Sequence, residues 1–543
     1  MGFSLYNMKK TTGSFVIRCV LIVLPLFSLF SIRMMNYYNN NLYIKFLYLI
    51  IFLLLWKLVS GNNVDVYPLY LLSISLSILL INGLRSEYIL GVDIHDEYYT
   101  YIEVLNNNYW DSKLPFLVNA CLSVTVLPSI FNLIMNASSN LSFNYLYILI
   151  SMFLPLNIYL ILRKKYNPQY SLFGAIFIIM QSAFLLNYNR PRTNVSIFFI
   201  SVFVLILSSH FNNKLVVILI PTIFAIITSH YGSSLIIFLV FIASYILIPN
   251  KNLKYVIIIF FISYYIWHHQ ITGWSFRAIT GALHLLLKSV LNNKMDYATT
   301  DLRSISSSGI DRILNLMHFM MYIIFIGIMS IGTMVSYYNK VKNDLIQNIS
   351  ISSLIFLLAT LLISSFNTRY PMIGIFNLLL VFNCNQLIIG YDHIYKKIYT
   401  NSTFGQKYFI MFFIFFIFFM FQNGVVYDMY NIPHSITLNS NGTTYEDQYI
   451  HFSDIAGINW VNKYSNEIYI NADYWTYEYF KSQKHLINEI RSNSDNGEFA
   501  FYRYTNTQKN IFKFTVISDK IIFMQYTKTM NIYNSHFDHI YTK

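Results

Sequence analysis

An acidic cluster with one histidine, Asp93-Ile94-His95-Asp96-Glu97, holds the side chains of this chain best suited to chemistry. Three carboxylates within five residues stand out in a chain of which only 11% of the residues are charged. Crowding and partial burial raise the pKa of one such carboxylate, which can then take a proton from an acceptor hydroxyl. Carboxylate oxygens also bind divalent cations. We therefore predict a catalytic group made of Asp93, His95, Asp96 and Glu97, with Asp93 and Glu97 as the ligands if Mg²⁺ or Mn²⁺ takes part.

The backbone conformation decides which of these side chains converge. In an extended segment, Asp93, His95 and Glu97 share one face. In a helix, Asp93 lies beside Asp96 and Glu97 instead. At least two carboxylates meet in either conformation. The simpler alternative is a solvated loop that carries ordinary surface acids.

Basic side chains form a second set of candidates. Arginine presents a planar fork that suits phosphate, and the alternative for each arginine is that it snorkels to lipid headgroups. His230-Tyr231 lies at the end of an apolar run, where an imidazole either binds phosphate or has a structural role. The arginines that fall on the predicted external side are Arg85, Arg190, Arg192, Arg277 and Arg369. The residues predicted to bind substrate or phosphate are Arg190, Arg192, His230, Tyr231 and Arg369.

The remainder of the chain indicates a membrane protein. Of its 543 residues, 55% are hydrophobic, and the mean hydropathy is +0.47. About 20 apolar residues cross a bilayer, and runs near that length recur along the chain. We predict an all-α transmembrane bundle of about 13 spans. Their expected ranges are 14–32, 43–60, 66–83, 143–162, 171–187, 194–209, 214–229, 233–249, 254–268, 313–337, 349–366, 371–390 and 407–423.

Basic residues between the apolar runs set the expected orientation. Lys9-Lys10 places the N-terminus in the cytoplasm, and alternation then puts four later basic loops on the same side. The external face receives an acidic loop, 84–142, a second loop, 269–312, and the whole C-terminal tail. Residues 116–135 either span the membrane or form a helix at its surface, and we expect the surface helix. Because the short basic loops and the tail account for the net charge of +13, nucleic acid is not an expected partner.

A change of composition near residue 424 divides the chain into two predicted domains. Residues 1–423 form the multi-span transmembrane domain, and residues 424–543 form a small extracytoplasmic α/β domain. In this tail, Phe512–Ile517 has the pattern of a strand, as does Glu467–Asn471. Asp454–Tyr464 has the pattern of an amphipathic helix.

Several common kinds of site do not occur in the sequence. P-loop, dinucleotide-binding and HExxH motifs are absent, which disfavours a nucleotide-driven pump. Cys19, Cys121 and Cys384 provide neither a disulfide framework nor a cysteine-based metal site.

Short motifs along the chain resemble a known group of proteins. Gly91–Tyr99, Tyr109-Trp-Asp111, Leu122–Pro128 and Ser229-His-Tyr231 are similar to segments of a family of uncharacterised archaeal multi-pass membrane proteins. The order of spans, acidic external loop and external C-terminal domain resembles the C-type (GT-C) glycosyltransferases, which use polyprenyl-phosphate-linked sugars. The chain departs from their oligosaccharyltransferase members, because it carries only Asp473-Tyr-Trp475 and lacks their Trp-Trp-Asp-Tyr-Gly motif.

The resemblance implies a glycosyltransferase of the cell membrane that transfers a sugar from a polyprenyl-phosphate donor to a saccharide or protein acceptor on the external face. Asp93 or Glu97 would act as general base or metal ligand, and His95 would orient a carboxylate or help to bind phosphate. The basic candidates would stabilise the lipid-phosphate leaving group. Two other functions stay open: transport or flipping of a lipid-linked saccharide or envelope polymer, and a non-catalytic role in envelope assembly.

Overall fold

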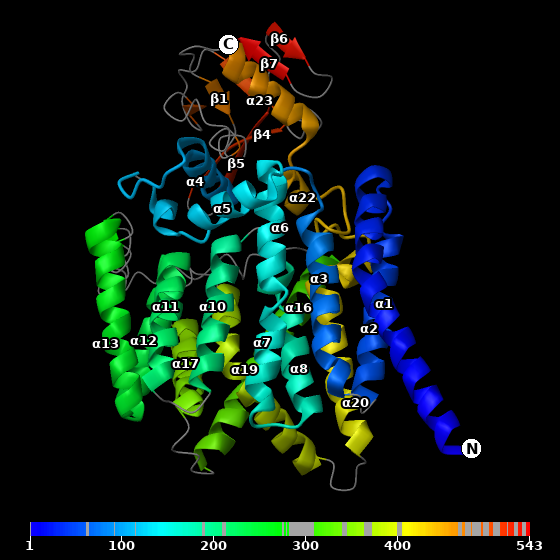
Figure 1. The fold of residues 1–543 in the computed structure, drawn as a ribbon. Coiled ribbons are helices and arrows are strands. Elements are labelled where there is room, and N and C mark those ends of the chain that lie inside the picture. Colours follow the sequence, from blue (N-terminus) through cyan, green and yellow to red (C-terminus); the bar gives the residue numbers. More distant parts are fainter. Residues whose placement is uncertain are drawn as a thin grey trace.

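The chain forms a long bundle of helices with a smaller mixed region at one end, as its computed structural model shows (Figure 1). We call this end the upper end; it carries α4 (Ile94–Asn107), α5 (Val126–Met135) and the residues after α20 (Phe404–Gln422), and the N-terminus lies at the other end (Figure 1). The structure describes residues 2–542 except 61–63, 92, 115, 187–189, 209–212, 274–275, 278–279, 282–308, 339–344, 363–371, 399–403, 465–469, 473–478, 480–489, 492–498, 503–510, 518–519, 526–529 and 535–538.

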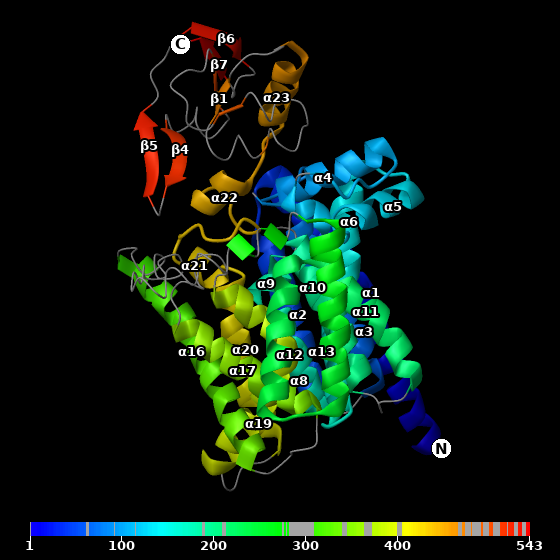
Figure 2. The same cartoon turned by 90° about the vertical axis from the view of Figure 1, so that its left-hand side faces the viewer.

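The bundle is helical because an apolar solvent requires every backbone N–H and C=O to be paired within the segment. Its long helices run side by side between the two ends (Figures 1 and 2). They are α1 (Gly2–Tyr38), α2 (Leu42–Ser60), α3 (Tyr67–Gly83), α6 (Ser139–Ser151), α7 (Leu154–Arg163), α8 (Pro168–Ile179), α10 (Pro191–Leu207), α11 (Asn213–Ser229), α12 (Tyr231–Leu247), α13 (Lys251–Tyr265), α16 (Gly309–Tyr338), α17 (Leu345–Leu362), α19 (Met372–Ile398) and α20. The short ones are η1 (Val64–Val66), η2 (Leu117–Ala120), α9 (Ser182–Leu185), η4 (Ile266–Ile271), α21 (Val425–Met429) and α22 (Thr443–Gln448), followed by α23 (Phe452–Tyr464).

Within the described residues, six helices are long and apolar enough to cross a membrane by length and composition. They are Val20–Tyr38, Leu42–Val59, Val64–Gly83, Ser139–Arg163, Gly309–Tyr338 and Gly374–Ile398. Shorter apolar helices of 10–17 residues lie between them. The expectation of a helical membrane bundle is confirmed, whereas the number of 13 spans stays a prediction.

Two predicted segments differ in detail from what the structure shows. The segment 143–162 belongs to the candidate span Ser139–Arg163, in which a turn at Met152-Phe153 separates α6, ending at Ser151, from α7, beginning at Leu154 with Pro155 in its first turn. Proline suits a first turn because it lacks the N–H that would be unpaired there. In 116–135, the structure has η2 and the ten-residue α5. Ten residues of helix extend about 15 Å, half of a bilayer core.

Glycines bring the two most extensively packed helices together. A side chain at Gly332 of α16 would place its Cβ 1.9 Å from the Gln386 carbonyl oxygen of α19. A side chain at Gly390 would approach the Ile328 carbonyl oxygen equally closely. Small residues allow this close approach between helices in a membrane. The Ser336 hydroxyl donates a 3.0 Å hydrogen bond to Gln386 Oε1 beside the contact.

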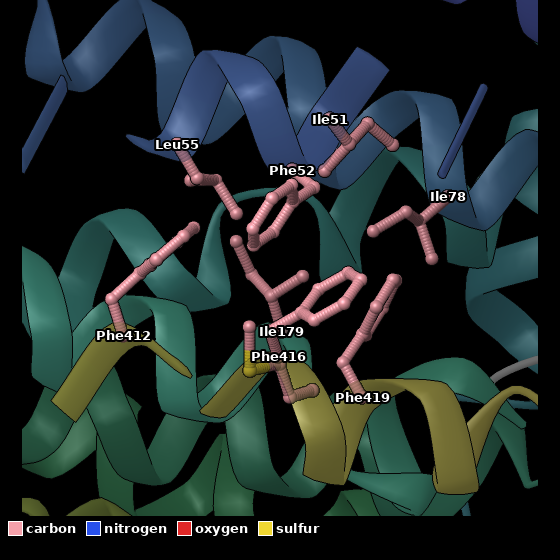
Figure 3. A pocket seen from close by; sticks show the side chains of 9 residues that line it. Ile51, Phe52, Leu55, Ile78, Ile179, Phe412, Phe416 and Phe419 are labelled. Carbon is pink, nitrogen blue, oxygen red and sulfur yellow. The ribbon is translucent and has the colours of Figure 1, made fainter. Parts of the chain in front are cut away.

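Apolar side chains make up most of the interior of the bundle, and buried serine, asparagine and glutamine side chains lie among them. Figure 3 shows the side chains of α2, α3, α8 and α20 that point toward a small gap between them. The gap measures about 10 Å³. Its lining is Ile51, Phe52, Leu55, Ile78, Ile179, Met180, Phe412, Phe416 and Phe419. A space of this size holds at most one water, so it is a packing gap and not a binding site.

The mixed region at the upper end contains strands as well as α22 and α23. The strands are β1 (Ile470–Ala472), β2 (Ile490–Arg491), β3 (Phe499–Tyr502), β4 (Ile511–Ile517), β5 (Lys520–Gln525), β6 (Met530–Asn534) and β7 (His539–Thr542). Five of them form a sheet in the order β2-β1-β3-β7-β6, with β1 parallel to β2 and β3 and the other pairs antiparallel. The hairpin β4-β5 is separate and pairs Phe512 with Met524.

Candidate functional site

The acidic cluster forms the start of α4 at the upper end. Asp93 is the N-cap residue, and Asp96 and Glu97 lie in the first turn. Carboxylates are favourable there because the N-terminal end of a helix carries partial positive charge. The extended conformation considered for these residues is therefore wrong, and the helical alternative is what the structure shows.

The helix separates the cluster into a buried and an exposed side. His95 and Glu97 are each only 1% exposed, whereas Asp93 is exposed and Asp96 is half-buried. The His95 ring meets the edge of the Tyr479 ring, 4.9 Å between centroids, so residues from the C-terminal region contact this helix. The buried face continues through Tyr101, which stacks on a phenylalanine of α6. Only part of the predicted catalytic group is therefore available to solvent.

A buried ion pair joins α4 to the N-terminus of α10. Arg192 Nε lies 3.0 Å from Glu97 Oε1, and the two side chains are 16% and 2% exposed. The backbone N–H of Arg192 also donates to the same carboxyl group. The other oxygen, Glu97 Oε2, is buried and has no hydrogen-bond partner among the described residues. One oxygen of the carboxyl group can therefore still accept a hydrogen bond from another partner.

The surroundings of Glu97 raise its pKa to about 7, from an ordinary value of 4.5. Burial is the largest cause, because a desolvated carboxylate loses its hydration. Arg192 acts in the opposite direction and lowers the pKa, while the nearby charges of Asp93 and Asp96 raise it. A carboxyl group with this pKa exchanges its proton near neutral pH, which suits a general base.

Two further predicted residues lie beside the ion pair. The Arg192 guanidinium sits over the Tyr231 ring, 5.9 Å from its centroid, which favours the cation on an aromatic face. His230 is the N-cap of α12: its Nδ1 accepts the backbone N–H of Ser233 at 3.0 Å. The His230 and Tyr231 rings are 5.1 Å apart. The structure thus brings Glu97, Arg192, His230 and Tyr231 together from three separate parts of the chain.

The other two predicted arginines are not part of this pair. Arg190 is the N-cap residue of α10 and is half-buried. Arg369 lies outside the described residues. Of the two arginines at the start of α10, it is therefore Arg192, the second residue of the helix, that holds the carboxylate.

Neighbouring residues that were not among the predicted site residues, some of them in the short motifs, fix this arrangement. The Ser123 hydroxyl donates to the Ser229 carbonyl oxygen at 2.9 Å, and the Tyr147 hydroxyl donates to the Ser123 carbonyl oxygen at 3.0 Å. Trp267 stacks on Trp110 with 5.5 Å between ring centroids. Cys121 is buried beside them, and burial raises the pKa of its thiol to about 12. Their spacing along the chain gives no period that would have pointed to them.

The predicted metal ligands do not make a full ligand set. Among the described residues, no group of three or more His, Cys, Asp and Glu side chains is placed to hold a metal ion. Asp93 is exposed, and one oxygen of Glu97 is already held by a guanidinium. A cation bound by Asp93 and Glu97 would need further oxygen ligands. A divalent cation at this position remains a prediction.

A second buried arginine lies at the same end of the bundle. Arg85 is 1% exposed and donates from all three nitrogens: to the Ile436 carbonyl oxygen at 2.8 Å, to Asn36 Oδ1 at 2.9 Å and to Ser440 Oγ at 2.8 Å. It also lies over two tyrosine rings of the C-terminal region, at 5.5 and 5.3 Å. Its hydrogen-bonding capacity goes into joining α1 to residues 436–449. Phosphate binding, one of the two roles considered for this arginine, is therefore not supported.

More than half of the chain, residues 214–543, matches the protein family described as "Predicted membrane protein (DUF2206)". The chain belongs to this family. The expected resemblance to a family of membrane proteins is therefore confirmed, and the helices described above are those of a membrane protein. None of the curated proteins matches the chain in sequence.

Solved structures to which the chain is similar include the Archaeoglobus fulgidus oligosaccharyltransferase in the apo form, at 14% identity over 77% of this chain and 64% of that chain, with a TM-score of 0.44. The same protein in complex with Zn and sulfate gives 14% identity over 77% and 61%, with a TM-score of 0.43. This DUF2206 member thus spans less than two thirds of their length. A likeness of this size leaves the activity to be inferred from the site itself.

Proposed function

We propose that this protein is a membrane glycosyltransferase that transfers a sugar from a polyprenyl-phosphate donor to a saccharide or protein acceptor at the upper end of the bundle, on the external face of the cell membrane. One observation carries the proposal. Glu97 is a buried carboxyl group with a pKa of about 7, one oxygen of which is held by Arg192 while the other is unpaired among the described residues. A general base needs this combination of proton affinity and a free acceptor atom.

The transfer needs one proton acceptor and one stabilised leaving group. In a single displacement, the acceptor oxygen forms a bond to the anomeric carbon of the sugar, and the bond from that carbon to the phosphate oxygen breaks. The acceptor proton moves to Glu97 Oε2, and the electron pair of the broken bond leaves with the polyprenyl phosphate. The charge of the phosphate grows as the bond breaks, so a nearby cation lowers the barrier.

The pairing of Glu97 with Arg192 links proton uptake from the acceptor to stabilisation of the leaving phosphate. While Glu97 is ionised, its negative charge offsets the guanidinium. Once Glu97 takes up the proton, the pair loses its negative member and the charge of Arg192 is no longer balanced. The guanidinium is then free to stabilise the phosphate as it departs.

The remaining predicted residues take supporting roles in this proposal. Asp93, exposed at the N-cap, lies close enough to influence the charge of both Glu97 and Arg192. His95 orients α4 through its contact with Tyr479. His230 and Tyr231 hold the Arg192 side, and Arg190 and Arg369 are further candidates for the phosphate. The apolar faces of the bundle would accompany the prenyl chain in the bilayer. We derive no step through a metal ion.

Because Glu97 is only 2% exposed in its side chain, a substrate reaches it only after the covering segments open. Such opening commonly precedes chemistry in enzymes with enclosed sites. Contacts between the C-terminal region and α4, such as that of Tyr479 with His95, are the ones that would move.

The test is transfer from a panel of radiolabelled polyprenyl-phosphate sugars by the purified full chain in nanodiscs. Glu97→Gln keeps the size and the hydrogen-bonding shape of the side chain but cannot take the proton. We expect it to lower transfer about 100- to 10,000-fold. Glu103→Gln, on the same helix and half-buried, is the matched control and should transfer like the wild type. Each protein is assayed with and without Mg²⁺ or Mn²⁺.

Two results would contradict the proposal. Undiminished transfer by Glu97→Gln would remove Glu97 as the base. Absence of transfer by the wild-type protein from every donor, with folding intact, would move the function to the transport or assembly alternatives.

A further inference from the structure

A cavity of about 220 Å³ lies between the bundle and the C-terminal region, apart from the Glu97–Arg192 pair. Its volume far exceeds the roughly 10–15 Å³ that one water needs. The lining comes from α3, α9, α16, α20 and the segment 434–448. The lining residues used below are Asn82, His318, Tyr322, Gln422, His434 and Gln448.

Three polar atoms of the lining residues are buried without a hydrogen-bond partner among the described residues. They are Asn82 Nδ2, His318 Nε2 and Gln448 Oε1. The whole Asn82 residue is 4% exposed, so water outside the protein does not serve it. A buried polar group without a partner costs free energy, and buried polar groups in folded proteins are normally satisfied by protein, water or ligand. These atoms have almost no accessible surface, so a ligand in the cavity forms hydrogen bonds with them after a small rotation of their side chains.

The hydrogen-bond network behind the cavity sets the role of His318. The Tyr427 hydroxyl donates its hydrogen to Asn315 Oδ1 at 2.9 Å. His318 Nδ1 lies 3.3 Å from the same hydroxyl oxygen, so the hydrogen of that bond comes from Nδ1. In a neutral imidazole with its hydrogen on Nδ1, Nε2 is an acceptor. The cavity thus offers a donor at Asn82 and acceptors at His318 and Gln448.

No charged side chain lines the cavity among the residues that the structure describes there. Burial lowers the pKa of His434, so this imidazole is neutral at pH 7. Arg85 is close, since it donates to the Ile436 carbonyl, but it is not a lining residue and each of its three nitrogens already donates a hydrogen bond elsewhere. A charged ligand would be desolvated there without a partner, which is costly. The cavity is therefore suited to neutral ligands.

Aromatic side chains add flat apolar surface to these hydrogen-bonding groups. The rings of His318 and Tyr322 stack with 5.7 Å between centroids, and Gln422 Nε2 donates to the Tyr322 hydroxyl. A ligand that matches this lining carries several groups that both donate and accept, set around a compact apolar frame. Sugar hydroxyls on a ring meet this description.

From this geometry we propose that the cavity between α3, α16, α20 and residues 434–448 binds a neutral saccharide unit, held by Asn82, His318 and Gln448. The site goes beyond the transfer chemistry proposed for Glu97, because binding here needs neither that carboxyl group nor a lipid phosphate. The two regions are nevertheless linked, since the Gly91 N–H, two residues before Asp93, donates to the Gln448 carbonyl oxygen at 3.4 Å.

The test is saturation-transfer NMR on the purified full chain in nanodiscs, with neutral methyl glycosides of glucose, galactose, mannose and N-acetylglucosamine at millimolar concentrations. Glucose 6-phosphate and glucuronate are the charged comparison probes. We expect binding of at least one neutral glycoside and a weakening of about tenfold in Asn82→Leu and in His318→Phe, each of which loses one hydrogen bond. His269→Phe, an exposed imidazole on η4, is the matched control and should bind like the wild type.

Gln448→Leu keeps the proposal testable if changes inside the bundle impair folding, because its side chain comes from the C-terminal region. Equal binding by the folded variants and the wild type would overturn the proposal. So would binding of the charged probes alone, or the absence of binding by every neutral glycoside. None of these results depends on transfer, so this proposal and the one for Glu97 can fail separately.

Discussion

Two arginines at the upper end of the bundle, the half-buried Arg192 and the buried Arg85, differ in the groups that offset their positive charge. Arg192 faces a carboxylate whose second oxygen has no partner among the described residues. Arg85 faces only neutral acceptors and tyrosine rings, and all three of its nitrogens donate. The first arrangement keeps unused hydrogen-bonding capacity and a titratable group, whereas the second uses all of its nitrogens to connect segments. This difference points to chemistry at Arg192 and to structural support at Arg85.

Burial and charge by themselves do not identify a functional arginine. Arg85 is 1% exposed and the Arg192 side chain is 16% exposed, and both lie at the same end of the fold. What separates them is whether a neighbouring group can still change its protonation state or bind a ligand. Glu97 can do so near pH 7, and the amide, carbonyl and hydroxyl acceptors around Arg85 cannot.

The largest effect on stability is expected from removing one member of the Glu97–Arg192 ion pair. Arg192→Met leaves a buried carboxylate without its cation, and we expect a loss of about 3–5 kcal/mol in the free energy of unfolding above pH 7. The double variant Glu97→Gln with Arg192→Met should recover most of this loss, because neither charge is then left alone. Thermal unfolding in detergent measures both. A double variant no more stable than the single one would contradict the pairing.

The pH dependence of stability also distinguishes Arg192, which has a titratable partner, from Arg85, which has none. The folded-state pKa of Glu97, about 7, lies above its ordinary value of 4.5, so the folded protein holds the proton more tightly. The contribution of Glu97 to the free energy of unfolding is fully present below pH 4.5 and is lost as the pH rises through about 7. The change amounts to at most about 3 kcal/mol.

Unfolding of the wild type and of Glu97→Gln, followed between pH 4 and about 8, tests this contribution. The wild type should lose stability relative to the variant across this window. Parallel curves would show that Glu97 does not titrate there, and Arg85 variants should leave the difference unchanged.

Replacement of Arg85 should affect stability with no pH dependence of this kind. Arg85→Met leaves the buried Ile436 carbonyl oxygen without its donor, and we expect a cost of about 2–3 kcal/mol. Arg33→Met, an exposed arginine on α1, is the control and should change stability by less than about 0.5 kcal/mol. A loss of transfer in Arg85→Met that exceeds its loss of folded protein would assign Arg85 a functional role.

The smallest expected effect comes from Asp93. Its charge raises the pKa of Glu97, so Asp93→Asn should lower that pKa and move the rise of transfer activity with pH toward lower pH. The shift should stay below about one pH unit and shrink with salt, because Asp93 is exposed and its charge is screened. The pH–rate profile at low and high salt measures it. Abolished transfer in Asp93→Asn would instead favour Asp93 as the base, the other assignment considered from the sequence.

Much of this site follows from the sequence, in a coarse form. An acidic cluster in a chain poor in charge marks residues 93–97, because carboxylates are seldom placed near a bilayer without a role. Arg192, His230 and Tyr231 were also among the predicted residues. The sequence did not separate Glu97 from Asp93, because their exposure depends on which face of α4 meets the bundle. It also did not separate Arg192 from Arg190, since one residue of helix decides which side chain reaches the carboxylate.

The polar cavity could not be predicted at all. Asn82, His318 and Gln448 are more than 100 residues apart from one another along the chain. Asn82 and Gln448 lie at the ends of α3 and α22, and His318 lies inside α16. Only the packing of the C-terminal region on the bundle brings them together. Arg369 and most of the predicted loop 269–312 lie outside the described residues, so their roles stay predictions.

That this protein is a helical membrane protein follows from its sequence, because apolar runs of span length have one stable conformation in a bilayer. The sequence also determined where the few charges lie along the chain. The tertiary structure alone decided that Glu97 faces inward onto Arg192 while Asp93 faces solvent, and that Arg85 is fully occupied. These outcomes depend on desolvation and on partners from distant segments, and neither is encoded in local sequence.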